Sequence, residues 1–175
     1  MYFKKLDIIF DVPDFETDGL AVQYGFDFED KFRGIWYNHI KKEEECILKH
    51  SIPDGLRDHF TVQLMEVNSY IPPHTDSDTL AAINFYINTS NCVTSFYDKK
   101  EGAEPHQIKN QTDGCIYSLD DLNLGPGFKA EPGDVYLLDV SKVHSVIPLD
   151  NGEIERKALC LSSSSLNFEQ VQELF

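Results

Sequence analysis

The sequence has no long apolar run, few cysteines and little positive charge. No stretch approaches the roughly 18 uninterrupted apolar residues of a membrane-spanning helix. The apolar run after Asp7 is too short for a signal peptide, so we expect no export signal. The four cysteines are widely spaced and form no Cys-x-x-Cys pair, which favours reduced thiols over a disulfide framework. These absences predict a cytoplasmic protein that makes no membrane contact.

The charge balance is strongly acidic. Fifteen basic against thirty acidic residues give a net charge of −15, which repels phosphate backbones and anionic lipid surfaces. Nucleic acid is therefore not expected as a partner. A chain of 175 residues without repeats or a composition shift suits one buried core rather than two. We predict one domain over residues 1–175, with a support region 1–60, a core 61–162 and a tail 163–175.

Short runs of β-branched and aromatic residues alternate with turn signals along most of the chain. The predicted turns are Pro53–Gly55, Asn88–Asn91, Gly125–Gly127, Pro132–Asp134 and Asp150–Glu153. The predicted strands are Phe3–Phe10, Thr61–Val67, Thr79–Asn88, Cys92–Tyr97, Cys115–Leu119, Val135–Leu138 and Arg156–Ser162.

Helical signals are few. Phe28, Phe32 and Trp36 recur at helical spacing within 27–50, where we expect a helix, and the tail from Asn167 predicts a short closing helix. The fold class is therefore mainly β, a jelly roll (double-stranded β-helix) or barrel with a few flanking helices.

The strand Thr79–Asn88 has two different faces. Ala81, Ile83, Phe85 and Ile87 form an apolar face, whereas the other face includes Asn84 and Tyr86. Such a strand packs on one side and lines a more polar interior on the other. The polar segment Lys99–Asn110 that follows is either a surface connection or a substrate lid.

A metal site is indicated by His74, Asp76 and His144. In an extended segment, residues two apart point the same way, so His74 and Asp76 address one point. His144 lies at the end of the Val135–Leu138 strand or at the start of the next. Two histidines and one carboxylate with open positions opposite suit non-haem Fe(II). The remaining histidines, His39, His50, His59 and His106, are interpreted as core or surface residues.

Arg156 has two interpretations. On a strand it shares a face with Ala158 and Cys160, so its guanidinium points inward and needs an anion, such as a ligand carboxylate. It is otherwise an exposed arginine at a strand start that pairs with Glu153 or Glu155. The sequence leaves both open.

Together, His74-x-Asp76, His144, Arg156 and the Pro132–Asp134 turn resemble the Fe(II)- and 2-oxoglutarate-dependent dioxygenases, nearest the prolyl 4-hydroxylase-like branch. The likeness covers Thr61–Ser162. It implies that His74, Asp76 and His144 ligate iron and that Arg156 binds the distal carboxylate of 2-oxoglutarate. It implies that Tyr86 hydrogen-bonds that same carboxylate. Thr94 and Phe96 stand at the family's Thr-x-Phe positions. Asn84, on the polar face with Tyr86, is assigned to the cosubstrate as well.

The resemblance implies an enzyme that uses O2 to hydroxylate a C–H bond, releasing succinate and CO2. A small molecule or peptide is the expected substrate, and a peptidyl or free amino-acid side chain is favoured. Three other classes stay open. A zinc hydrolase also uses such ligands but has no need of Arg156 and Tyr86. A cupin-type metal enzyme usually carries a His-x-His signature, which this sequence lacks. A non-catalytic jelly roll can bind ligands without metal.

Overall fold

The computed structural model describes residues 1–9, 17–28, 31–41, 45, 49–50, 52–68, 70–76, 78–107, 115–150 and 154–175. Residues 17–28, 31–37 and 39 are described by their backbone alone. Within these residues no helix is long and apolar enough to cross a membrane.

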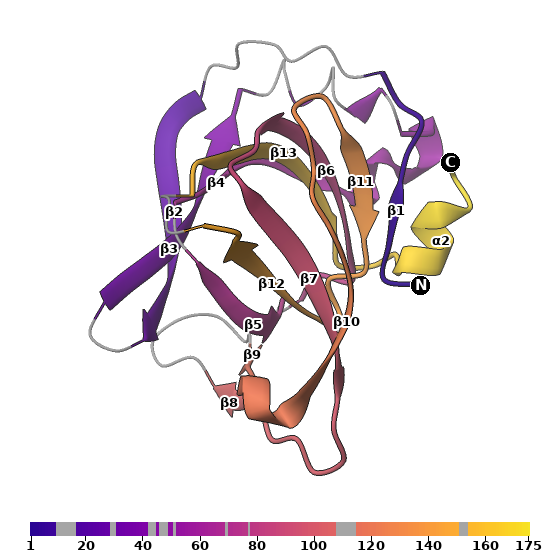
Figure 1. The fold of residues 1–175 in the computed structure, drawn as a ribbon. Helices are drawn as coiled ribbons and strands as arrows, with labels where there is room; N and C mark the ends of the chain where they lie inside the picture. Colours follow the sequence, from indigo (N-terminus) through magenta and orange to yellow (C-terminus); the bar gives the residue numbers. More distant parts are fainter. Residues whose placement is uncertain are drawn as a thin grey trace.

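Two antiparallel sheets form the molecule (Figure 1). Among the described residues the larger sheet has the order β1-β11-β6-β13-β4-β3-β2, and the smaller has the order β10-β7-β12-β5-β9-β8. The larger sheet contains β1 (Phe3–Lys5), β2 (Thr17–Phe28), β3 (Lys31–Ile40), β4 (Thr61–Val67), β6 (Ala81–Asn88), β11 (Val135–Leu138) and β13 (Arg156–Ser163). The smaller contains β5 (Ile71–Thr75), β7 (Cys92–Lys99), β8 (His106–Gln107), β9 (Cys115–Ile116), β10 (Leu122–Phe128) and β12 (Val143–Pro148).

The strand sequence is that of a jelly roll. From β4 to β7, and again from β10 to β13, successive strands alternate between the two sheets. The helical elements whose bounds are described are α2 (Phe168–Gln172) and the 3-10 turns η1 (Asp54–His59) and η2 (Leu119–Asp121). The predicted fold class is confirmed.

The two faces of β6 lie in two different cores, as predicted. Ala81, Ile83 and Phe85 pack with residues of α2 on the outer side of the larger sheet. Ala82 and Tyr86 pack between the sheets with residues of β5, β7 and β12. The inner face of β6 therefore lines the interior in which the candidate site lies.

Several predicted elements match closely. β4, β11 and β13 follow the predicted strands, and α2 begins at the predicted position with a capping box between Asn167 and Gln170. The Pro132–Asp134 turn holds Gly133 at a φ of +89°, a conformation that glycine adopts freely. This turn also bonds the backbone of Tyr86. Gly133 N donates to the carbonyl of Tyr86, and the N–H of Tyr86 donates to Asp134 O.

Other predicted boundaries are shorter or shifted. Strand structure covers only Phe3–Lys5 of the first segment and Cys115–Ile116 of the fifth. The predicted Pro53–Gly55 turn forms the start of η1. β7 is longer than predicted and ends at Lys99, and it belongs to the smaller sheet, whereas β6 belongs to the larger. Most of the predicted Asp150–Glu153 turn and the end of the 99–110 segment lie outside the described residues.

The predicted helix over 27–50 is wrong for its first part. The chain there forms β3, preceded by the end of β2. β3 pairs with β2 on one side and with β4 on the other, in a register that sets Ile35 opposite Val67. Sheet pairing with a distant strand overrides a local helical spacing. Glu45 and Lys49 are helical, and most of the remainder lies outside the described residues.

The predicted Gly125–Gly127 turn is also wrong, because these residues lie within β10. β10 is an edge strand of the smaller sheet, and its pairing with β7 shifts register between Leu124 and Gly127. An edge strand with a bulge accommodates both glycine and proline. The sequence signal marks an irregularity in the strand rather than a reversal of the chain.

Gly127→Ala should destabilise the protein. A Cβ at this position would lie 2.9 Å from Thr94 O and 3.1 Å from Val93 Cγ1, so the β10–β7 pair must separate. Overpacking of this kind costs about 1–3 kcal/mol, and denaturant unfolding measures it. Gly55→Ala is the matched control, since nothing lies within 4 Å of its Cβ. Equal stability of the two variants would contradict the close approach.

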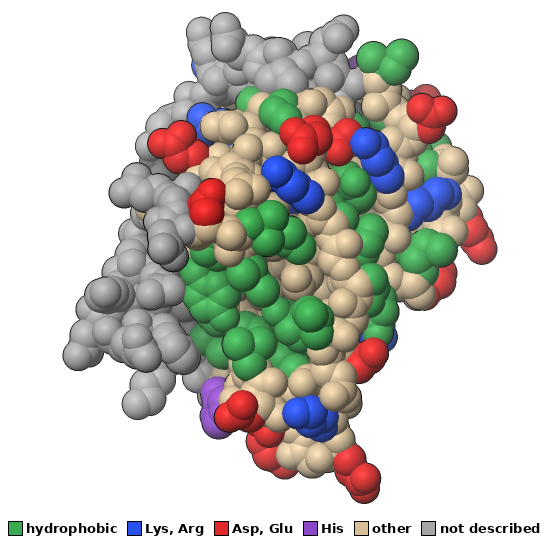
Figure 2. Space-filling model, viewed as in Figure 1, with side chains coloured by type: hydrophobic (Ala, Val, Ile, Leu, Met, Phe, Trp, Pro, Cys, Tyr) green, Lys and Arg blue, Asp and Glu red, His purple; other side chains and the backbone are tan. Residues whose placement is uncertain are grey.

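The smaller sheet presents an apolar surface on one side. Figure 2 shows hydrophobic side chains gathered over the middle of this face, in front of β5, β7 and β12, with charged side chains around them. The candidate site lies on the opposite, inner side of these strands.

Candidate metal centre

His74 and His144 lie side by side on neighbouring strands of the smaller sheet. They are register partners in the β5–β12 pair, and their ring centroids are 4.3 Å apart. Both are buried, with exposed fractions of 5% and 7%. Sheet pairing therefore joins two histidines separated by seventy positions of sequence.

Each ring is oriented by a backbone carbonyl. His74 Nδ1 lies 2.8 Å from Pro72 O, and His144 Nδ1 lies 2.9 Å from Lys142 O. A carbonyl oxygen can only accept, so both Nδ1 atoms carry the proton. Both rings therefore direct Nε2 toward the same point, which is the orientation that a metal-bound histidine needs.

Asp76 completes the group. It directly follows β5, and its Oδ1 lies 3.3 Å from His74 Nε2 and 3.8 Å from His144 Nε2. Burial raises the pKa of Asp76, but the interaction of its carboxylate with the neighbouring imidazoles of His74 and His144 outweighs this effect, and the net pKa is lowered. The carboxylate is therefore ionised at neutral pH.

His144 is neutral at the same pH. Burial and the neighbouring His74 imidazole lower the pKa of His144 to about 4, against the attraction of Asp76. A neutral imidazole and a carboxylate are the protonation states in which these side chains bind a metal. The electrostatics of this site thus suit a cation.

The three side chains could hold one metal ion. Their ligand atoms all lie within 4.8 Å of one another. Ligands on one face of an ion, each about 2.1 Å from it, lie about 3 Å apart, so the group would have to contract on binding. No other such group occurs in the part of the chain that the structure describes.

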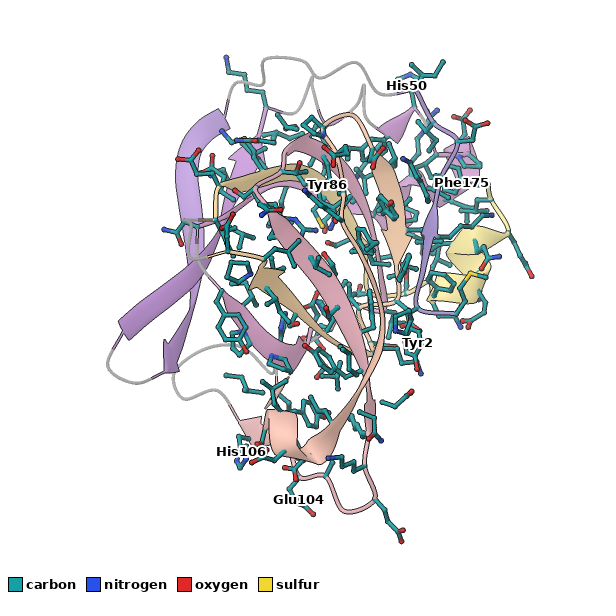
Figure 3. All side chains as sticks on the ribbon, viewed as in Figure 1. Tyr2, His50, Tyr86, Glu104, His106 and Phe175 are labelled. Atoms are coloured by element: carbon teal, nitrogen blue, oxygen red, sulfur yellow. The ribbon has the colours of Figure 1, made fainter. Side chains whose placement is uncertain are left out.

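Arg156 lies between the sheets rather than at the surface. It is 4% exposed, its Nη1 donates to Thr94 Oγ1 at 2.8 Å, and its Nη2 donates to the Tyr86 hydroxyl. Figure 3 shows Tyr86 beside β6 and β13, opposite β7. The alternative of an exposed arginine is wrong, because β13 turns this side chain inward together with Ala158 and Cys160.

Two buried polar atoms in this region have no partner among the described residues: Arg156 Nε and Asn84 Oδ1. The amide of Asn84 makes one long bond, from Nδ2 to the Tyr86 hydroxyl at 3.4 Å. Among the described residues no carboxylate pairs with Arg156 either. Each unsatisfied buried group costs about 1–3 kcal/mol. A ligand that accepts from Arg156 Nε would remove part of this cost.

The metal group and Arg156 face one continuous interior. On β7, Thr94 and Phe96 are two residues apart and so point to the same side, where Thr94 meets Arg156 and Phe96 meets His144. Inward positions of this kind are spaced by about 7 Å along a strand. The two subsites are therefore near enough for one small molecule to contact both.

A cavity of about 470 Å³ opens at the end of the barrel where β13 begins. It reaches Arg156 but none of the three metal-group residues. Its lining consists of Glu66, Val67, Asn68, Asn88, Ile154, Glu155, Arg156 and Lys157.

The structure therefore brings all seven predicted site residues into one interior. Of the other histidines, His59 bonds Ser165 at the surface, and His50 and His106 are exposed; the side chain of His39 lies outside the described residues. Sequence analysis missed the supporting carbonyls of Pro72, Val140 and Lys142. Backbone contacts carry no side-chain signal, so only the fold could reveal them.

Comparisons with known proteins add little. Neither the known protein families nor the curated proteins yield a match. Among solved structures, vicilin from Corylus avellana (hazelnut) is similar over 81% of this chain, with 11% identity and a TM-score of 0.40. The match spans 31% of the vicilin chain.

Proposed function

We propose that the protein is an Fe(II)- and 2-oxoglutarate-dependent dioxygenase of the hydroxylase type. The observation that carries the proposal is a buried arginine that pairs with no carboxylate of the described residues and lies between the same two sheets as a His-Asp-His group. A metal group alone would serve a zinc hydrolase equally well. A buried guanidinium with a free donor adds a second requirement, an anionic ligand.

The residues that would hold Fe(II) are His74, Asp76 and His144. Three protein ligands of this kind would leave other coordination positions of the iron open to a chelating cosubstrate and O2. With 2-oxoglutarate and O2, the bound iron supplies the oxidising power that hydroxylates a C–H bond and releases succinate and CO2.

The residues that would hold 2-oxoglutarate are Arg156, Tyr86, Thr94 and Asn84. Thr94 and Tyr86 fix the two terminal nitrogens of Arg156, and its Nε stays available to a carboxylate. The hydroxyl of Tyr86 accepts from Arg156 and can donate its own proton to the same carboxylate. Asn84 adds a second free polar atom along the wall that leads toward the metal group.

The burial of the side chains around the proposed cosubstrate site also supports the proposal. Tyr86 and Phe96 are fully buried on opposite walls, so a bound cosubstrate would be shielded from water. The prime substrate that we favour is a peptidyl or free amino-acid side chain, as the resemblance implies. A cytoplasmic location remains a prediction of the sequence.

Ligand-dependent melting tests the proposal. At a concentration of 100 times Kd, Fe(II) with 2-oxoglutarate should stabilise the protein by about 2.7 kcal/mol. For a chain of this size the melting temperature rises by roughly 2–4 °C per kcal/mol. The measurement is made without oxygen; with oxygen, succinate should form even without a prime substrate.

The control ligand is 2-oxobutyrate, which has the same keto-acid head but no distal carboxylate. It should stabilise the protein far less, because it cannot reach Arg156. Stabilisation by zinc alone, with no effect of 2-oxoglutarate, would favour a hydrolase. Binding of the keto acid without metal and without succinate formation would favour a binding module.

A further inference from the structure

One turn of the backbone touches two of the three residues of the metal group. In the turn Asp139–Lys142, Val140 O accepts from Asp76 N at 3.3 Å, and Lys142 O accepts from His144 Nδ1 at 2.9 Å. The turn is closed by Lys142 N donating to Asp139 O and by Ser141 Oγ donating to Asp139 Oδ1 at 2.5 Å. Its conformation therefore sets the positions of Asp76 and His144 relative to each other.

Tyr2 holds this turn from the far end of the sequence. Its carbonyl accepts from Asp139 N at 2.9 Å, next to the residue that bonds Asp76. Its hydroxyl donates to the carboxylate of Asp98 on β7. Tyr2 thus joins the turn to the neighbouring strand of the smaller sheet, on the side where the chain begins (Figure 3).

The ring of Tyr2 forms a second connection to the metal group. It packs on Phe96 with centroids 5.6 Å apart, and Phe3 packs on the same ring at 5.7 Å. Phe96 is fully buried and lies against His144, with centroids 5.8 Å apart and planes inclined by 30°. Because Phe96 contacts Tyr2, Phe3 and His144, the packing of Tyr2 and Phe3 limits the movement of Phe96 against His144.

We propose that Tyr2 is a positioning residue for the metal centre. It acts on Asp76 through the Asp139–Lys142 turn and on His144 through Phe96. The inference rests on the proposed function only in that the His-Asp-His group binds a metal; it needs neither 2-oxoglutarate nor turnover. Contacts that orient metal ligands typically change metal affinity by 10–100-fold when they are removed.

Titration with Co(II), whose visible absorption reports ligand geometry, tests the assignment on the full chain. Tyr2→Ala should weaken Co(II) binding about tenfold or more and alter the absorption bands. Tyr2→Phe keeps the ring on Phe96 and loses only the bond to Asp98, so it should restore most of the affinity. Ser141→Ala, a surface change that loosens the turn, should weaken binding in the same direction.

Lys5→Ala is the matched control. Lys5 ends β1, the strand that directly follows Tyr2, and its ion pair with Asp134 involves none of the contacts of the metal group. It should lower the melting temperature slightly and leave Co(II) affinity unchanged. The melting temperature of each metal-free variant shows whether a loss of Co(II) affinity comes from a less stable fold or from misplaced metal ligands.

Affinities within twofold of the wild type for both Tyr2→Ala and Ser141→Ala would overturn the assignment and reduce Tyr2 to a residue that closes the sheet edge. If Tyr2→Ala does not fold, Ser141→Ala and Tyr2→Phe decide by themselves. Failure of the wild type to bind Co(II) is a different result, because it removes the metal centre itself.

Discussion

We expect His74→Ala to abolish Fe(II) binding and turnover while the protein stays folded. The substitution removes one of three protein ligands, so the loss in affinity should exceed the 10–100-fold that is typical of an orienting contact. The backbone of His74 still pairs with β12 and β9, which keeps the sheet intact. Metal titration measures the loss, and circular dichroism checks the fold.

His59→Ala is the control for this substitution. His59 is exposed at the end of η1, and among the described residues its side chain bonds Ser165 alone. The same change in side chain should therefore leave metal binding as in the wild type. Normal succinate release from His74→Ala would contradict the metal assignment, whatever the effect of the control.

Arg156→Met should raise the 2-oxoglutarate requirement strongly and affect metal affinity little. A hydrogen bond to a charged group contributes about 1.5–3 kcal/mol, which corresponds to roughly 10- to 150-fold in the concentration needed. Methionine keeps most of the buried volume, and loss of an unpaired buried charge should not destabilise the protein. Succinate formation at varied 2-oxoglutarate, with melting of the metal-free protein, gives both quantities.

Two further variants sharpen the result. Arg156→Lys keeps the charge but loses the planar fork, so its requirement should fall between those of wild type and Arg156→Met. Arg57→Ala removes a surface arginine that pairs with Asp54 and should leave the requirement unchanged. An unchanged requirement in Arg156→Met would assign Arg156 a purely structural role.

Alternation of side chains was the most informative signal in the sequence. It predicted β4, β11 and β13 closely and separated the two faces of β6, because the pleat sends neighbouring residues to opposite sides. His74 and Asp76 were found by the same reasoning. From the sequence, the participation of His144, seventy positions later, was a hypothesis. The pairing of β5 with β12 places it beside His74.

Local signals failed where distant pairing decided the outcome. The helical spacing of Phe28, Phe32 and Trp36 predicted a helix, yet Phe28 and Phe32 lie in the β2–β3 pair and Trp36 also pairs with β4. Gly125–Gly127 predicted a turn, yet the segment is a bulged edge strand. Residues 10–16 and 108–114, which include part of the predicted lid, lie outside the described structure.

By itself, the sequence determined the class of fold and the types of side chain available for chemistry, because strand periodicity and residue chemistry are local properties. Only the tertiary structure decided that Arg156 is buried without a carboxylate partner among the described residues, and that Tyr2 and the Asp139–Lys142 turn support the metal group. These features depend on hydrogen bonds and packing between segments far apart in the chain, and such contacts form only when the two sheets close on each other.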